Sequence, residues 1–244
     1  MTILISFKSD ENRMDKSDVQ EVLASLYLRL NGYFVSGHIV HAAQGVATEV
    51  DLLAIRFPLH DEAEREVECS QHLEIPLDAV DFLVGEVKGS DAAINFNSRF
   101  RENPASIRGV LRRFGAFESD EIERAVGLLP QVLDPATVRR NASYPELTLT
   151  MLGRNSPQHV KMRFILFASN QKRPDLNTRP YVYQDDMIGY IWRCFRPEVN
   201  RPGCAVRYDF GLWGPQFETM TRAFKNKALG EPPTLAQLYA AYGV

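Results

Sequence analysis

The sequence lacks long hydrophobic runs, has few cysteines and shows no excess of positive charge. No apolar stretch approaches the roughly 20 residues of a membrane-spanning helix, and the one that ends at Phe7 is too short for a signal peptide. Cys69, Cys194 and Cys204 are odd in number and scattered, which favours free thiols over a disulfide framework. The formal net charge of −3 is not that of a general nucleic-acid binder. We therefore expect a cytoplasmic protein with no membrane partner.

What the sequence does contain is the composition of a globular protein with a substantial core. It has 244 residues, of which 45% are hydrophobic and 24% are charged. Short apolar runs with strand character alternate with segments of helical spacing. We therefore predict an α/β fold in which helices flank a mixed central sheet. The predicted organisation is a core at residues 1–180 and a C-terminal helical extension at residues 181–244 that packs on the core.

The first predicted helix follows a capping sequence. Ser17 and Gln20 have the S-x-x-Q spacing of a capping box, apolar residues recur at helical spacing in the following turns, and Asn31-Gly32 is typical of a helix end. Glu21 lies near the start of this helix, where the helix dipole stabilises a carboxylate. Two interpretations remain open for Glu21: a solvated first-turn glutamate, or an accessory ligand of a metal ion or water.

Two predicted strands carry charged residues inside apolar runs. Residues 46–57 are apolar on both faces except at Asp51, and the run at residues 79–90 includes Glu86 and Lys88 near its end. Because successive side chains of a strand point to opposite faces, Glu86 and Lys88 share one face. Buried charges require a partner or a ligand. If the two strands pair, two carboxylates and one lysine meet at one point, as in a divalent-metal phosphodiesterase. For Asp51 the alternative is a structural salt bridge.

This arrangement resembles a known family. Asp51, then a gap, then Glu86-Val87-Lys88 is similar to the motif of the PD-(D/E)XK nuclease superfamily, which has the restriction-endonuclease-like fold. Glu21 on a preceding helix fits the same pattern and is a candidate catalytic residue. The order of helix, strand, and strand with E-x-K agrees with that family.

The resemblance covers residues 17–90 and departs from the family pattern in two places. Val50 precedes the motif aspartate where the pattern has proline, and no glutamine-tyrosine motif of the kind found in some branches follows Lys88. These departures leave the subfamily open.

The resemblance implies an activity, a cofactor and roles for individual residues. It implies a metal-dependent endonuclease or exonuclease that hydrolyses phosphodiester bonds, with DNA as the expected substrate and a restriction-endonuclease-like core. Asp51, Glu86 and the backbone carbonyl of Val87 would hold Mg²⁺ or Mn²⁺. Lys88 would orient the attacking water or stabilise the developing negative charge.

A predicted helix after this motif carries several arginines. Arg108 and Arg112 are four residues apart and share a face, and Arg113 follows directly. With a net negative charge, contacts to nucleic acid must come from such a local basic face. We predict that these three arginines bind phosphates; the alternative is a basic, solvated helix face.

A second function of a different class remains open. A protein with a nuclease fold can bind nucleic acid or a protein partner without cutting, for example as a defence or restriction accessory. Three buried charges argue against a pure scaffold, because a scaffold has no need of them. The sequence also leaves a homodimer open.

Overall fold

The computed structural model describes most of the chain, and the statements below concern these ranges. The described residues are 14–42, 45–60, 67–89, 96–140, 144–151, 158–170, 181–196, 214–225 and 230–244. Within them, six strands form one sheet: β1 (Phe34–Ala42), β2 (Gly45–Arg56), β3 (Val80–Lys88), β4 (Glu146–Met151), β5 (Gln158–Ala168) and β6 (Tyr181–Tyr183). The helices are α1 (Lys16–Leu30), α2 (Ser98–Glu102), α3 (Pro104–Phe114), α4 (Ser119–Val132), α5 (Pro135–Arg140), α6 (Gln184–Phe195), α8 (Pro215–Phe224) and α9 (Leu235–Tyr242), with a 3₁₀ turn at Gln71–Leu73.

The sheet is mixed, with β3 at the change from antiparallel to parallel pairing. Its order is β1-β2-β3-β5-β4, and β6 pairs with the end of β5. Strands β1, β2 and β3 are successively antiparallel, whereas β3 and β5 are parallel and are connected through α2–α5 and β4. The predicted α/β fold with a mixed sheet flanked by helices is confirmed. Because β6 lies at residues 181–183, the sheet continues past the predicted boundary at residue 180.

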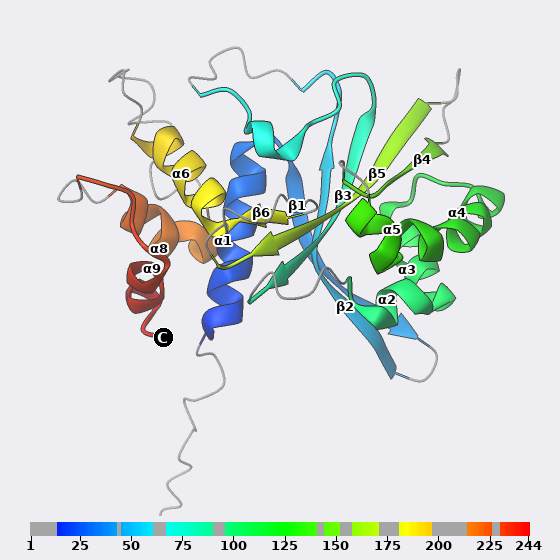
Figure 1. Ribbon diagram of the computed structural model, residues 1–244, viewed down its shortest axis with the longest axis horizontal. Helices are drawn as coiled ribbons and strands as arrows, with labels where there is room; N and C mark the ends of the chain where they lie inside the picture. Colours follow the sequence, from blue (N-terminus) through cyan, green and yellow to red (C-terminus); the bar gives the residue numbers. More distant parts are fainter. Residues whose placement is uncertain are drawn as a thin grey trace, which may run out of the picture.

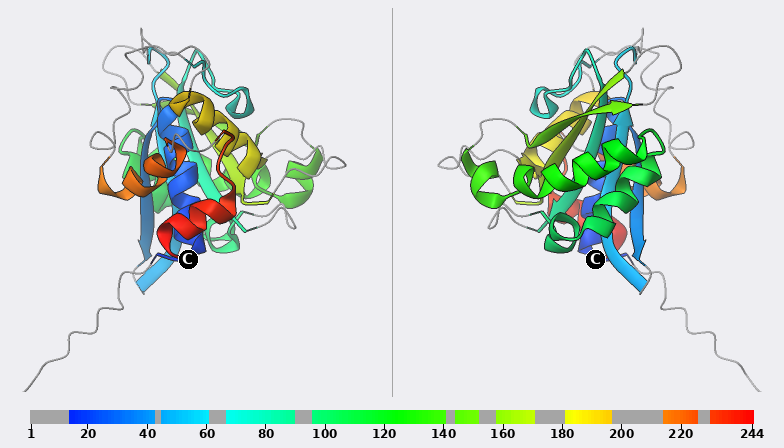
Figure 2. Two further views of the ribbon diagram at one scale, coloured as in Figure 1. Left: turned by 90° about the vertical axis from the view of Figure 1, so that its left-hand side faces the viewer. Right: turned by 90° about the vertical axis from the view of Figure 1, so that its right-hand side faces the viewer.

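Helices cover both faces of the sheet (Figure 1). One face packs against α1, α6, α8 and α9, and the other packs against α2, α3 and α4. The green helices α3 and α4 lie across the sheet in the right-hand view of Figure 2, and the orange and red α8 and α9 lie near α1 in the left-hand view. Strand alternation divides β3 between the two cores: Leu83 belongs to the first, and Phe82 and Val84 belong to the second.

The N-terminal cap of α1 differs from the prediction. Asp15, not Ser17, is the N-cap: its carboxylate accepts hydrogen bonds from the backbone N–H groups of Ser17 and Asp18 at 2.7 and 3.0 Å. The Asp18 carboxylate accepts from the Asp15 N–H at 2.7 Å and completes a capping box. Two carboxylates at the positive end of the helix also gain from its dipole, which a serine cannot do. The predicted end is confirmed, since Asn31 is the C-cap and Gly32 has a φ of 85°.

Among the helices within the described ranges, none combines the length and the apolar character of a membrane span.

Candidate functional site

A bulge in β2 changes the direction of Asp51. Ser36 of β1 pairs with Leu53, and His38 pairs with Val50, so three steps along β2 oppose two steps along β1. Val50 and Leu53 both lie in the core beneath α2–α4, although regular alternation would put them on opposite faces. The extra residue turns Asp51 to the other face, where it lines a cavity beside α1. Bulges of this kind commonly redirect a side chain next to an active site.

The Asp51 carboxylate lies where β2 and β3 separate. The ladder between these strands reaches Leu52 and Gly85. One residue further, Oδ2 of Asp51 accepts a hydrogen bond from the backbone N–H of Val87 at 2.7 Å. The N–H and C=O of one strand residue point to the same side, so the Val87 carbonyl also faces Asp51. The side chain of Asp51 thus binds the backbone of the E-x-K segment.

Glu86 is held in place from two directions. The side chain is buried, and its two oxygens accept hydrogen bonds from the backbone N–H of Asn97 at 2.7 and 2.9 Å. Asn97 comes just before α2. On the same face of β3, Nζ of Lys88 lies 2.6 Å from Oε2 of Glu86, and the Lys88 side chain remains 30% exposed. Lys88 therefore reaches both the buried carboxylate and solvent.

The electrostatics of Glu86 are dominated by its burial. Burial raises its pKa above the ordinary value for glutamate. The charge of Lys88 and the Asn97 hydrogen bond lower this pKa, and the negative charge of Asp51 raises it further. Two carboxylates that repel each other in a partly buried place favour a bound cation.

The oxygen atoms at this place suit a hard divalent cation. Asp51, Glu86 and the Val87 carbonyl supply ligands of the type that Mg²⁺ prefers, and Mg²⁺ usually keeps several waters as well. Among the described residues, no three His, Cys, Asp or Glu side chains form a group that could hold a metal ion. Binding would thus depend on two carboxylates, with the remaining positions left to water and substrate.

Glu21 and Asp51 lie at the same level of a cavity of about 830 Å³ beside α1. Nε of Arg56, near the end of β2, donates to the carbonyl of Asn31, at the end of α1, at 3.1 Å. From this contact back along β2, Asp51 is five residues and about 16 Å from Arg56. From the same contact back along α1, Glu21 is ten residues and about 15 Å from Asn31, so the two carboxylates are at similar distances from the contact. The cavity is lined by Met14, Asp18, Glu21, Val22, Ser25, Arg29, Tyr33, Phe34, Val35, Ser36, Gly37, Asp51, Leu52, Gln216 and Phe217.

Glu86 and Lys88 lie outside that cavity. They continue the face of β3 that carries Phe82 and Val84, against α2–α4. The structure therefore brings Asp51, Glu86 and Lys88 together at the edge between the two faces, and it joins Glu21 to Asp51 through the cavity.

The three predicted phosphate-binding arginines lie on α3. Nε and Nη2 of Arg108 donate to the two carboxylate oxygens of Glu123 on α4, both at 2.6 Å. Arg112 and Arg113 are exposed. Arg108 therefore already has a carboxylate partner, while the other two face solvent.

The end of α3 lies away from the acidic residues. Phe114, its last residue, packs against Phe82 near the start of β3. Glu86 follows four residues later, about 13 Å along the strand. The structure thus brings Arg112 and Arg113 close to the beginning of β3 and not to the E-x-K segment.

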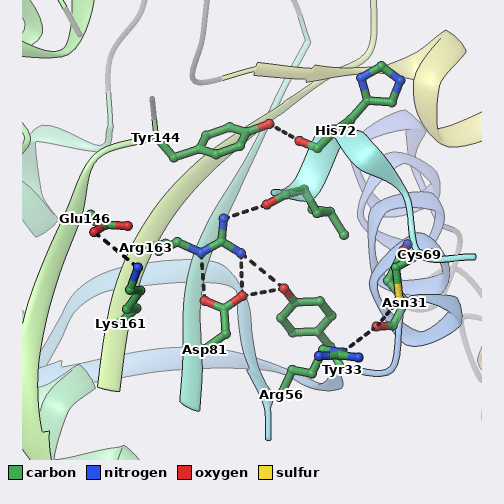
Figure 3. Close-up of polar contacts among 11 residues, drawn as sticks. Asn31, Tyr33, Arg56, Cys69, His72, Asp81, Tyr144, Glu146, Lys161 and Arg163 are labelled. Carbon is green, nitrogen blue, oxygen red and sulfur yellow. Dashed lines mark hydrogen bonds and ion pairs between the residues drawn. The ribbon is translucent and has the colours of Figure 1, made fainter. Parts of the chain in front are cut away.

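A second charged cluster, which sequence reasoning missed, lies at the beginning of β3 (Figure 3). Arg163 of β5 donates to both carboxylate oxygens of buried Asp81, in one case from Nε to Oδ1 at 2.8 Å. The hydroxyl of Tyr33 also donates to Asp81, and Nη1 of Arg163 donates to the Leu73 carbonyl at 2.6 Å. Asp81 shows the same sequence signal as Asp51, one acid in an apolar strand, but here the acid has a fully buried cationic partner.

Comparison of the chain with protein-family models, with curated proteins and with solved structures gave no match. The function is therefore inferred from the residues and their geometry.

Proposed function

We propose that the protein is a metal-dependent nuclease that hydrolyses phosphodiester bonds, with DNA as the expected substrate. The observation that carries this proposal is the meeting of Asp51, Glu86 and Lys88 where β2 and β3 separate. Two carboxylates and one lysine on adjacent strands match the requirements of this reaction. The order α1, β1–β2, β3 with E-x-K also supports a restriction-endonuclease-like core of the PD-(D/E)XK type.

In this proposal each residue has a defined part. Asp51 and Glu86 bind the cation, and the backbone N–H groups of Val87 and Asn97 fix the orientation of these two carboxylates. A bound Mg²⁺ or Mn²⁺ would polarise the scissile phosphate and lower the pKa of the attacking water. Lys88, which is partly exposed beside Glu86, orients that water or stabilises the charge that develops on the phosphate.

Glu21 has an accessory part. It shares the cavity with Asp51 and lies at the same level, so it can hold a water beside that carboxylate. Its contribution is expected to be smaller than that of Asp51, because it is not part of the E-x-K cluster.

The direct test is cleavage of plasmid, linear duplex and single-stranded DNA in Mg²⁺, Mn²⁺ or EDTA. We expect cutting that EDTA abolishes and that Asp51→Ala removes. Lys161→Met is the matched control for Lys88→Met, because both lysines lie on strands, pair with a glutamate and are 33% and 30% exposed. Cutting that persists in EDTA, or in Asp51→Ala, would contradict the proposal.

One observation favours a second candidate, a protein that binds nucleic acid without cutting it. Both oxygens of Glu86 already accept hydrogen bonds from Asn97, and one of them contacts Lys88. A carboxylate so well satisfied by the protein has less need of a cation. Binding of DNA with no cleavage in any divalent cation would favour this alternative.

A further inference from the structure

The cavity beside α1 has opposite charges at its two ends. Glu21 and Asp51 lie at one end, and Arg29 lies in the last turn of α1, eight residues after Glu21 and thus about 12 Å along the helix. Among the described residues that line the cavity, Arg29 is the one cation. An anionic group in the cavity is therefore attracted to the Arg29 end and repelled at the other end unless a cation is bound there.

Arg29 is oriented by an aromatic ring. Its guanidinium carbon lies 4.8 Å from the ring centroid of Phe217, a buried residue of α8 that also lines the cavity. Burial lowers the pKa of Arg29, yet an arginine stays charged at all physiological pH values. Stacking on the ring restrains the plane of the guanidinium group. Arginine combines such stacking with a fork of five N–H donors that matches the geometry of phosphate.

An exposed aromatic pair lies at the same end of the cavity. Phe34, the first residue of β1, lines the cavity although its side chain is 63% exposed. It contacts Phe57, which is also exposed, edge to face, with ring centroids 6.4 Å apart. Two exposed rings in contact form a contiguous apolar patch, and such patches can mark the place where a ligand or partner binds. A flat aromatic face beside a positive charge is the common platform for an unpaired nucleobase.

We infer that this cavity takes an unpaired nucleotide of a single-stranded or frayed nucleic acid, an inference that rests on the proposed function. The base stacks on Phe34, a phosphate of the same strand binds Arg29, and the strand continues toward Asp51. A base shows its face only outside the duplex stack. The cavity volume of about 830 Å³ is within the range of small-ligand pockets, about 300–1,000 Å³, and so suits one nucleotide and not a duplex.

The test measures binding in EDTA, so that cleavage does not interfere. Fluorescence anisotropy compares a short single-stranded DNA with its duplex, using wild type, Phe34→Ala, Phe34→Trp and Arg29→Gln. Leu77→Ala is the matched control, because Leu77 is an exposed apolar residue that lies outside the cavity lining. We expect tighter binding of the single strand, a loss of roughly 10-fold in Phe34→Ala, and near-normal binding in Phe34→Trp.

Arg29→Gln should weaken binding and also reduce its dependence on salt, because a phosphate contact acts through counterion release. Duplex binding as tight as single-strand binding, or an effect of Phe34→Ala no larger than that of Leu77→Ala, overturns the inference. The latter result would leave the aromatic pair to a protein partner.

Cleavage in Mg²⁺ on the same DNAs separates this inference from the proposed function. If Phe34→Ala cuts both DNAs at the wild-type rate, the nuclease stands and the inference fails. If no DNA is cut but single-strand binding depends on Phe34 and Arg29, the nuclease proposal fails and the nucleotide site stands.

Discussion

Strand β3 carries two buried carboxylates five residues apart, and their surroundings are opposite in kind. Asp81 forms a two-bond ion pair with Arg163 and accepts from Tyr33, and the whole cluster is buried. Glu86 has one partly exposed lysine as its cationic partner and a second carboxylate nearby. In the first cluster a buried guanidinium binds both oxygens of Asp81, whereas in the second cluster burial and the negative charge of Asp51 both raise the pKa of Glu86. A carboxylate whose negative form is disfavoured in this way, and not a buried charge as such, therefore distinguishes a place that suits a cation.

The polar neighbours of the two carboxylates also differ: Tyr33 lies beside Asp81, and Lys88 lies beside Glu86. Burial and the nearby Asp81 raise the pKa of Tyr33 well above its ordinary value, so Tyr33 stays neutral; its hydroxyl donates to Asp81 and accepts from Nη2 of Arg163 at 3.2 Å. Lys88 reaches solvent as well as Glu86. One cluster is closed to ligands and holds strands together, and the other remains accessible.

The largest expected effect comes from breaking the closed cluster. Arg163→Met leaves Asp81 buried without its cation, and we expect the free energy of unfolding to fall by about 3–5 kcal/mol. Urea unfolding measures this, with Lys161→Met as control, because that lysine lies on the same strand, is partly exposed and is as far as 4.0 Å from its partner Glu146. If the free energy of unfolding falls equally little in both variants, the ion pair between Arg163 and Asp81 does not stabilise the fold. Replacing both partners with apolar residues should recover much of the loss.

The next effect concerns the open cluster and activity instead of stability. Lys88→Met should leave the protein folded and able to bind Mg²⁺, while cleavage falls by roughly 100-fold or more, the scale of losing one preorganised electrostatic group. Single-turnover cleavage at saturating Mg²⁺ measures the change against Lys161→Met. Asp51→Ala should instead lose cation binding and cleavage together, which calorimetry detects. Near-normal cleavage by Lys88→Met would contradict the assignment of Glu86-Val87-Lys88 as an E-x-K motif. It would favour the second candidate, a protein that binds nucleic acid without cutting it.

A smaller effect appears in the dependence of stability on pH. The raised pKa of Glu86 means that, in the acidic range just above the ordinary glutamate pKa, the folded protein holds a proton that the unfolded chain has released. The stability contributed by this proton is fully present below the ordinary pKa and is lost as the pH rises through the raised pKa. Glu86→Gln should remove this fall, and added Mg²⁺ should reduce it in the wild type.

Unfolding by urea over a pH series without divalent cations measures this effect, with exposed Glu146→Gln as control. A wild-type curve that does not differ in shape from that of Glu86→Gln would mean that Glu86 titrates normally.

The smallest effect is expected on the α3 surface. Reversing the charges of Arg112 and Arg113 to glutamate should weaken nucleic-acid binding several-fold and flatten its salt dependence. Thermal stability should change little, because both side chains are exposed. Unchanged binding and salt slope would make this helix face a plain solvated surface. A larger loss of nucleic-acid affinity in Arg29→Gln than in this double variant would show that the cavity, and not the α3 surface, binds the nucleic acid.

The sequence was sufficient for features that depend on neighbouring residues. The position of α1 follows from its apolar spacing and from Asn31-Gly32, and the shared face of Glu86 and Lys88 follows from strand alternation. The approach of Asp51 to this segment followed from assuming that two apolar runs pair, as they do.

Features that depend on distant contacts could not be predicted. The bulge that redirects Asp51 exists only in the pairing of β2 with β1, and the stacking of Arg29 on Phe217 joins α1 to α8, which lies far along the sequence. The pairing of Asp81 with Arg163 likewise requires knowledge that β3 and β5 are adjacent. Local sequence patterns contain no information on which of two buried acids has a cationic partner.

The bulge in β2 makes the site sensitive to the number of residues as well as to their identity. Removing Leu52 would restore regular alternation and move Asp51 into the place of Leu52, opposite Gly85 and toward the core beneath α1, so that its carboxylate would no longer lie at the N–H of Val87, while every side chain of the cluster would remain in the sequence. Insertions and deletions in this segment are therefore more damaging than most substitutions in it. A variant chain can keep all the candidate catalytic residues and still lose the site because one neighbouring residue is deleted. A gap in a sequence alignment at this segment is therefore as informative as a substitution.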